Sequence, residues 1–294
     1  MSQVGWITCR DLPEPDPDEA PATAALEAAG LNVERLVWDR VEPRAAAGLS
    51  LALLRSPWNY FEAPDRFSTW LAGLAESCPL LNPLPAARWN LHKRYLEQLA
   101  GEGVEIIPTA FLERGMAVDL AALVDERGWG AFVIKPAISA GSFATRRFSR
   151  SEIEAAVAFL AQHLVERDML VQVYVDSVAS MGERCYVWID GGFSHAVDKH
   201  PRFSGDDESV SGALELHSQE RELGERILTA ALKLIPLQKE ALLYARVDTV
   251  TIGDRRVLSE LELLEPSLFL LQSPSAMAKF VEAVAKRARA GAAS

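Results

Sequence analysis

The spacing of hydrophobic and polar positions divides the first part of the chain into short strands and helices. Three short apolar runs are typical of buried strands, and two stretches with apolar residues at helical spacing predict helices between or after them. The strands are predicted at Val4–Thr8, Val33–Trp38 and Ser50–Leu54, and the helices at Asp18–Ala29 and Phe67–Leu74. This alternation favours a parallel sheet, so we expect a small parallel α/β domain over residues 1–85.

The next part of the chain, residues 86–168, is predicted to form a second lobe. It opens with one helix over residues 83–104, which has Pro85 in its first turn and Gly101 and Gly103 at its end. Further strands and helices follow. The strands are predicted at Glu105–Phe111, Ala131–Lys135 and Thr145–Phe148, and the helices at Val118–Glu126 and Ser151–His163.

The remaining residues, 169–294, are predicted to form a third lobe rich in strands. An Asp-Gly-Gly turn at residues 190–192 separates two strand-like runs, which is the pattern of a tight hairpin. Residues 202–211 are polar and predicted to be a loop. The strands are expected at Met169–Val175, Arg184–Ile189, Phe193–Val197, Leu242–Ile252 and Arg256–Leu264, and the helices at Gln219–Lys233 and Ala276–Ala290. The overall expectation is an α/β protein.

Composition narrows the function. The 294 residues are 49% hydrophobic, which is enough to form a sizeable core. The formal net charge of −11 argues against a protein that coats nucleic acid, because such a protein needs a basic surface. The N-terminus lacks the pattern of a secretory signal, and no apolar run reaches the length of a membrane span. We therefore expect a cytoplasmic protein without membrane or nucleic-acid partners. The three cysteines (Cys9, Cys78 and Cys185) show no metal or disulfide spacing.

The strongest chemical signal is a group of acids near the C-terminal end. Asp248 lies in one predicted strand, and Glu260 and Glu262 lie two residues apart in the next, so the two glutamates share a face. If the strands pair across the Gly253-Asp254 turn, three carboxylates converge. A cation such as Mg²⁺ would relieve their repulsion. The alternative is a solvated face of an amphipathic hairpin.

Three other segments could contact a nucleotide. Lys135 ends an apolar strand and leads into the small-residue loop at residues 137–145, whose backbone could approach a phosphate although it lacks the P-loop spacing. Lys93 lies in a basic helix, and Gln172–Val175 could present backbone groups to an adenine edge. The alternatives are an ordinary turn, a solvated basic face and a core strand.

The substrate site is expected at the ends of the N-terminal strands, where open α/β sheets commonly bind ligands. The candidates are Arg10, Arg55, Trp58 and Asn59.

Taken in order, these segments resemble a known family. The motifs SPWNY, LLNPLPAARWNLHKRYL, VIKPAISAG, LVQVYV, GFSHAVDKHP, LLYARVD and ELELLEPSLFL are similar to those of the ATP-grasp superfamily with a glutathione-synthetase-like ATP-binding domain. Within it the chain resembles small bacterial ligases related to the cycloserine-forming ligase. The resemblance implies an ATP-grasp fold with an N-terminal pre-ATP-grasp domain.

The resemblance also implies residue roles. ATP would be held by Lys93, Lys135, the loop Ser139, Ala140, Gly141 and Ser142, the segment Gln172, Val173, Tyr174 and Val175, and Glu183 at the ribose. Two Mg²⁺ ions, replaceable by Mn²⁺, would bind to Asp248, Glu260 and Glu262. Catalytic groups would be Arg246, Lys199 and Arg202, the last only if it replaces an arginine motif that this chain lacks. The loop and residues 204–211 would close over the site.

The leading functional hypothesis is a carboxylate–amine ligase that works through an acyl phosphate. It would join small amino acids by a peptide or isopeptide bond, for example a γ-glutamyl bond, in specialised metabolism such as antibiotic biosynthesis. The first alternative is ring closure within one substrate, as in the cycloserine-forming branch. The second, of another class, is a non-catalytic nucleotide-binding module. The partners are small amino acids, and a homo-oligomer is possible.

Overall fold

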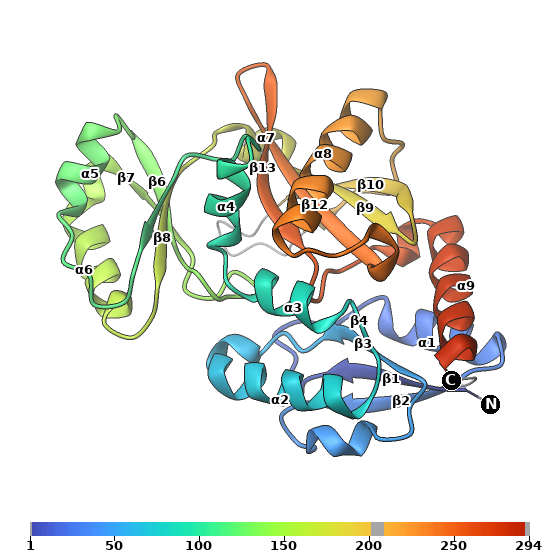
Figure 1. Ribbon diagram of the computed structural model, residues 1–294. Coiled ribbons are helices and arrows are strands. Elements are labelled where there is room, and N and C mark those ends of the chain that lie inside the picture. The colour runs from blue at the N-terminus through green and yellow to red at the C-terminus, as the bar shows by residue number, and fades with distance from the viewer. Residues whose placement is uncertain (1, 201–208, 292–294) are drawn as a thin grey trace.

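The structure is a computed structural model that describes residues 2–200 and 209–291. Figure 1 shows three sheet-containing lobes: the N-terminal lobe in blue, a central lobe in green, and a large sheet in yellow and orange. Helix α9 (Pro274–Gly291), drawn in red, returns from the large sheet to the N-terminal lobe, so the two chain ends of the picture lie near each other.

The N-terminal lobe is a parallel sheet in the order β2-β1-β3-β4. Val4 and Trp6 pack towards α1 and α9, whereas Ile7 and Leu54 pack towards α2. Because both faces of the sheet are covered, the inner strands β1 and β3 are buried almost throughout, whereas the edge strand β2 exposes Asn32, Glu34 and Arg35. The elements are β1 (Gln3–Thr8), α1 (Glu19–Ala28), β2 (Asn32–Val37), η1 (Pro43–Ala46), β3 (Leu51–Ser56), η2 (Tyr60–Glu62), α2 (Pro64–Ser77) and β4 (Leu80–Leu81).

Two short helices, α3 (Leu84–Leu91) and α4 (Tyr95–Gly101), connect this lobe to the rest of the chain. The single helix expected here is wrong, because the chain is extended at His92. Tertiary hydrogen bonds account for the break. The Lys93 amide donates to the Ala137 carbonyl over 2.8 Å, and the His92 ring lies 3.1 Å from the Asp168 carboxylate.

The central lobe is an antiparallel sheet in the order β5-β8-β6-β7. Its α5 and α6 helices cover the outer face, where Phe132 and Ile134 pack. Strand β8 belongs to this sheet, so the sheet extends past residue 168, where we expected the third lobe to begin. The elements are β5 (Thr109–Leu112), α5 (Leu120–Glu126), β6 (Ala131–Pro136), β7 (Arg146–Ser149), η3 (Arg150–Glu152), α6 (Ile153–Leu164) and β8 (Met169–Val173).

The large sheet is antiparallel in the order β11-β10-β9-β12-β13. Its predicted hairpin is confirmed, with both turn residues, Asp190 and Gly191, at positive φ. Ser209 and Val210 form a strand where we expected a loop, and residues 202–208 of that stretch lie outside the described residues. The elements are α7 (Ser177–Met181), β9 (Glu183–Ile189), β10 (Gly192–His200), β11 (Ser209–Val210), α8 (Ser218–Leu234), η4 (Lys239–Ala241), β12 (Tyr244–Ile252), β13 (Arg255–Glu262) and η5 (Leu270–Gln272).

Helices α4 and α8 cover one face of the large sheet, and α9 packs against part of the other. The uncovered part of that second face turns towards the central lobe. No helix within the described ranges is long and apolar enough to cross a bilayer.

Candidate active site

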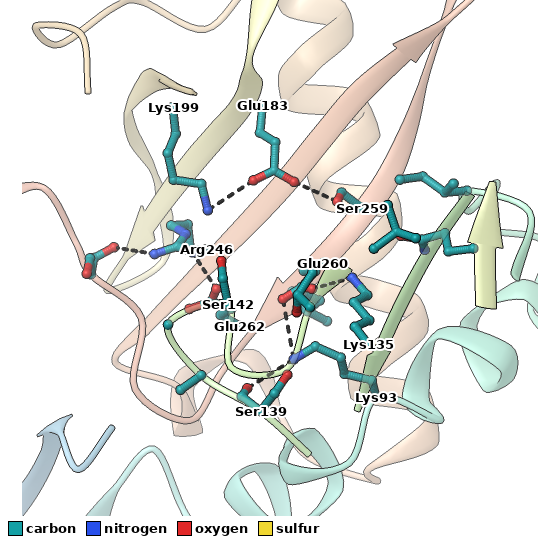
Figure 2. A pocket seen from close by; sticks show the side chains of 18 of the residues that line it. Lys93, Lys135, Ser139, Ser142, Glu183, Lys199, Arg246, Ser259, Glu260 and Glu262 are labelled. Atoms are coloured by element: carbon teal, nitrogen blue, oxygen red, sulfur yellow. Dashed lines mark hydrogen bonds and ion pairs between the residues drawn. The ribbon is translucent and has the colours of Figure 1, made fainter. Parts of the chain in front are cut away.

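A deep pocket lies where the three lobes meet. Strands β6 and β8 form one wall, the β12–β13 hairpin with β9 and β10 forms the opposite wall, and the N-terminal lobe closes one end. Figure 2 shows the charged side chains of the two walls pointing towards one another. The charged lining residues are Glu14, Lys93, Lys135, Glu183, Lys199, Arg246, Glu260, Glu262 and Glu265.

The β12–β13 hairpin places the predicted acids together. Asp248 is directly opposite Glu260, and Arg246 is directly opposite Glu262. Because residues two apart in a strand share a face, all four side chains project to the same side of the sheet. Glu260 and Glu262 line the pocket, whereas Asp248 lies behind Arg246 with 1% of its surface exposed.

Each of these carboxylates is paired with a cation of the protein. The Arg246 guanidinium donates to both Asp248 oxygens over 2.8 Å and also to Glu262. Glu260 lies 2.7 Å from the Lys135 ammonium and 3.5 Å from that of Lys93. Within the described ranges, no three Asp, Glu, His or Cys side chains converge as they would around a metal ion.

The acids differ in protonation. Burial alone would raise the pKa of Glu260, but the Lys135 and Lys93 ammonium groups outweigh it and hold the pKa well below its usual range. Burial raises the pKa of Glu262 to about 8, because the nearby Asp248 and Glu265 charges oppose the effect of Arg246. The hairpin therefore offers two carboxylates with lowered pKa values, Asp248 and Glu260, and one with a raised pKa, Glu262.

A second group of interacting polar side chains lies on the large sheet, on strands β9, β10, β12 and β13. The Lys199 ammonium lies 3.0 Å from Glu183 and 3.6 Å from Asp248, and the Ser259 hydroxyl donates to Glu183 over 2.8 Å (Figure 2). Burial would lower the pKa of Lys199, but Glu183 and Asp248 raise it well above its usual value. A permanently charged ammonium thus faces the pocket. That Glu183 holds a ribose stays a prediction.

The small-residue loop lies over the pocket and is tethered at both sides. Gly141 and Ser142 have φ values of 57° and 59°, which turn the backbone sharply. The Lys93 ammonium and the Tyr60 hydroxyl each donate to the Ser139 carbonyl over 3.3 Å. Beyond the loop's tip, the Phe143 ring stacks on Phe61 of the N-terminal lobe with centroids 4.3 Å apart.

The predicted adenine segment lines the apolar end of the pocket. The four residues Gln172 to Val175 all contribute to the lining, together with Ile107, Val178 and Val250. The Gln172 side chain donates to the Thr109 hydroxyl over 2.9 Å, which leaves the apolar neighbours to form the slot. Such a slot suits a flat aromatic ring.

Three of the four predicted substrate residues lie outside the pocket lining. Arg10 is exposed and pairs with Asp11, and the Asn59 side chain bonds to Trp38 and Asp39. Arg55 is fully buried, where its guanidinium donates to the Pro266 carbonyl over 2.8 Å. These expectations are corrected, because polar side chains at the strand ends are used to join elements inside the protein. Only Trp58 reaches the pocket. Arg202 lies outside the described residues.

The sequence patterns missed several lining residues. Tyr60 comes from η2, and Ser259, Glu265, Ser267 and Phe269 come from β13 and the segment after it. A faint signal existed, because the segment Glu-Pro-Ser-Leu-Phe follows the acidic strand directly and contains a third glutamate.

Comparisons with known proteins agree with this architecture. The chain is 30% identical over 286 residues to the cycloserine biosynthesis protein DcsG of Streptomyces lavendulae, covering 92% of this chain and 94% of that protein. Residues 4–82 match the family described as the N-terminal domain of D-cycloserine synthetase DcsG. The crystal structure of that synthetase superposes with a TM-score of 0.87 and 29% identity, over 98% of this chain and 100% of that one.

More distant structures share the fold alone. A RimK-domain ATP-grasp protein from Sphaerobacter thermophilus has a TM-score of 0.67 at 17% identity, over 98% of this chain and 99% of that one. A Bacillus anthracis D-alanine–D-alanine ligase complexed with ATP has a TM-score of 0.66 at 14% identity, over 99% of each chain. The three sheets and the pocket between them define an ATP-grasp protein. By its identity over nearly the whole length, the chain belongs to the ATP-grasp ligase family that includes the D-cycloserine synthetase.

Proposed function

We propose that the chain is an ATP- and Mg²⁺-dependent ligase that activates the carboxylate of a small amino acid and joins it to an amine. One observation carries the proposal. Lys93, between α3 and α4, and Lys135 of β6 both lie against Glu260 of the acidic β12–β13 hairpin, in a pocket that the small-residue loop also lines.

The donor chemistry of these residues suits both ligands, although in the part of the chain that the structure describes the three carboxylates do not converge on one point. Asp248, Glu260 and Glu262 offer only carboxylate oxygens, the donors that Mg²⁺ prefers, and Lys93 and Lys135 offer positive charge to phosphates. Each carboxylate is at present balanced by a lysine or arginine. On binding of a triphosphate with its metal, these ion pairs would be exchanged for new ones. The lysines would contact the phosphates, and the carboxylates would contact the metal. We propose two metal ions, with Mn²⁺ able to substitute.

When bound, ATP would supply the phosphoryl group that makes the substrate carboxylate an acyl phosphate, and Mg²⁺ would offset the phosphate charge. Lys93 and Lys135 would hold the phosphates in line with the carboxylate. Arg246, which Asp248 and Glu262 hold in this structure, would face the carbonyl oxygen. The amine would attack the carbonyl carbon, phosphate would leave with the C–O electron pair, and the surplus proton of the amine would pass to the departing phosphate. The loop from Ser139 to Ser142 would keep water from the activated carbonyl.

Ring closure within one substrate is the version we favour. The supporting observation is the similarity to a D-cycloserine synthetase over nearly the whole chain, at almost the same length. The product there, by its name, is a cyclic amino acid derivative. The intermolecular ligase that the sequence patterns favoured remains the second candidate, because D-alanine–D-alanine ligase shares the fold.

The test is ADP formation with Mg²⁺ or Mn²⁺ across single and paired amino acids and O-substituted serines, with product masses. We expect ADP release that needs one amino acid and yields a product lighter than that substrate. A condensed mass from two substrates would favour the intermolecular ligase. ATP binding without ADP from any compound would support the non-catalytic module and overturn the proposal.

A further inference from the structure

Among the pocket acids, Glu265 differs from the rest. Asp248, Glu260, Glu262 and Glu183 each form an ion pair with a lysine or arginine. Within the described ranges, no ion pair joins a lysine, arginine or histidine to Glu265, although only 8% of its surface is exposed. A buried carboxylate without a cation is costly, so such a group gains when a ligand brings positive charge.

The surroundings of Glu265 suit an organic ammonium. The Tyr60 hydroxyl, which donates to the Ser139 carbonyl, is close enough to lower the pKa of the Glu265 carboxylate, and Trp58 and Phe269 add aromatic surface to the pocket lining. Burial raises the pKa of Glu265, and Tyr60 with the more distant Lys93, Arg246 and Arg55 offsets this only in part. An alkylammonium would gain both an ion pair and contact with ring faces there.

The backbone that carries Glu265 is held rigidly. Three consecutive carbonyls, of residues 265, 266 and 267, accept hydrogen bonds from buried side chains: Trp58 over 3.1 Å, Arg55 over 2.8 Å and Arg246 over 3.1 Å. Two of these donors come from the N-terminal lobe and one from β12. The Glu265 carboxylate is thus fixed relative to Arg246, the group nearest the expected reacting carbonyl.

We infer that Glu265 binds the α-ammonium group of the amino acid substrate and so selects amino acids over carboxylates that lack an amine. The inference rests on the proposed function, which places the carboxylate of the substrate near Arg246. With the ammonium at Glu265 and the carboxylate at Arg246, one amino acid spans the substrate end of the pocket. Trp58 and Arg55 act as positioning residues through the backbone of residues 265 and 266.

Binding is tested by calorimetry on the full chain saturated with a non-hydrolysable ATP analogue and Mg²⁺. The probes are D- and L-serine, D- and L-alanine and D-cycloserine, compared with glycerate and lactate. For the wild type we expect at least one amino acid to bind roughly 10- to 100-fold more tightly than its hydroxy-acid counterpart. Glu265→Gln should reduce this preference to about twofold or less, with ATP-analogue affinity and unfolding temperature unchanged.

Two variants sharpen the result. Glu62→Gln removes an exposed acid beside Tyr60 and should keep the wild-type preference. Glu14→Gln removes a pocket acid that the N-terminal lobe contributes. Loss of the preference in Glu14→Gln but not in Glu265→Gln would overturn the inference, as would a changed Mg²⁺ requirement in Glu265→Gln without a changed preference. Failure of every probe to bind wild type would overturn it too.

The outcome for the proposed function is separate. Amino acid binding that depends on Glu265 without any ADP formation would sink the ligase and leave the ammonium site standing. ADP formation that is indifferent to Glu265→Gln would do the reverse.

Discussion

The two ends of the pocket are built on opposite principles. At the proposed nucleotide end, Lys93 and Lys135 balance Glu260, and Lys199 balances Glu183. At the substrate end, Glu265 is buried among aromatic groups with no ion-pair partner in the described ranges. Under the proposed function, ATP and its metal would replace the ion pairs at the first end, whereas an ammonium would supply the ion-pair partner that Glu265 lacks at the second.

The largest effect should come from the nucleotide end, through Lys135→Met. The substitution removes the closer of the two ammonium groups on Glu260 and one proposed phosphate contact. We expect kcat for ADP formation to fall about 10²- to 10³-fold, the scale of losing one charged donor in a buried site. Steady-state kinetics with the substrate found above measures it, and amino acid binding should change little.

The matched control is Lys239→Met, which removes a lysine from a partly exposed pair with Glu225. Such surface pairs contribute little, so its activity should equal that of the wild type. If Lys135→Met retained more than about half of the activity, the charge exchange at the nucleotide end would be wrong.

The next effect belongs to the substrate end, through Trp58→Phe. Phenylalanine keeps the ring but lacks the indole N–H that donates to the Glu265 carbonyl. We expect KM for the amino acid to rise about five- to tenfold, equivalent to one hydrogen bond of about 1 kcal/mol, with KM for ATP unchanged. Both constants come from the same ADP assay.

Trp70→Phe is the control for this variant, because the Trp70 indole donates to the Val41 carbonyl over 2.8 Å in the same lobe. It should lower the unfolding temperature to a similar degree without touching either KM. Equal KM changes in both variants would mean that Trp58 acts through general stability rather than through Glu265.

The same contrast shows how far the sequence could lead. The acids of β12 and β13 were found because strand side chains alternate with a period of two, and the turn at Gly253 brings the strands together. The inner strands of the N-terminal lobe, β1 and β3, were found because both of their faces are buried, whereas the two-residue strand β4 was not predicted. Both predictions depend only on the spacing of residues along the chain, so the sequence alone was sufficient for them.

Tertiary contacts decided the rest. The helix break beside Lys93 depends on hydrogen bonds to Ala137 and Asp168, which lie far along the chain. Arg55 looked like a ligand-binding residue at a strand end, yet it is used to hold the Pro266 carbonyl. Glu265 could not be distinguished from its neighbours, because its distinctive property is the lack of a cation partner in three dimensions.

A smaller effect, on KM for ATP, is expected from the contact between the small-residue loop and the N-terminal lobe. Phe143, which lies in the small-residue loop, stacks on Phe61 of the N-terminal lobe. Phe143→Leu should loosen the loop and raise KM for ATP about threefold to tenfold, in line with about 0.5–1.5 kcal/mol for an aromatic pair. Phe159→Leu, which alters a ring contact on the outer helix α6, should leave KM alone. Unchanged KM in both variants would show that the stacking does not hold the loop.

The smallest effect concerns pH and the support beneath the substrate end. His195 is buried below the Phe269 carbonyl, and burial lowers its pKa from 6.5, which that carbonyl and Asp18 offset only in part. Because the unfolded chain binds a proton below about pH 6.5 and the folded chain does not, stability is present above that pH and is lost as the pH falls. We expect the free energy of unfolding from denaturant titrations to decline from pH 7 to pH 5.5, by at most about 1.4 kcal/mol per pH unit from this group. His195→Gln should flatten that part of the profile, whatever its effect at pH 7. An unchanged slope would mean that another buried histidine, such as His92, whose pKa burial also lowers from 6.5, accounts for the acid sensitivity.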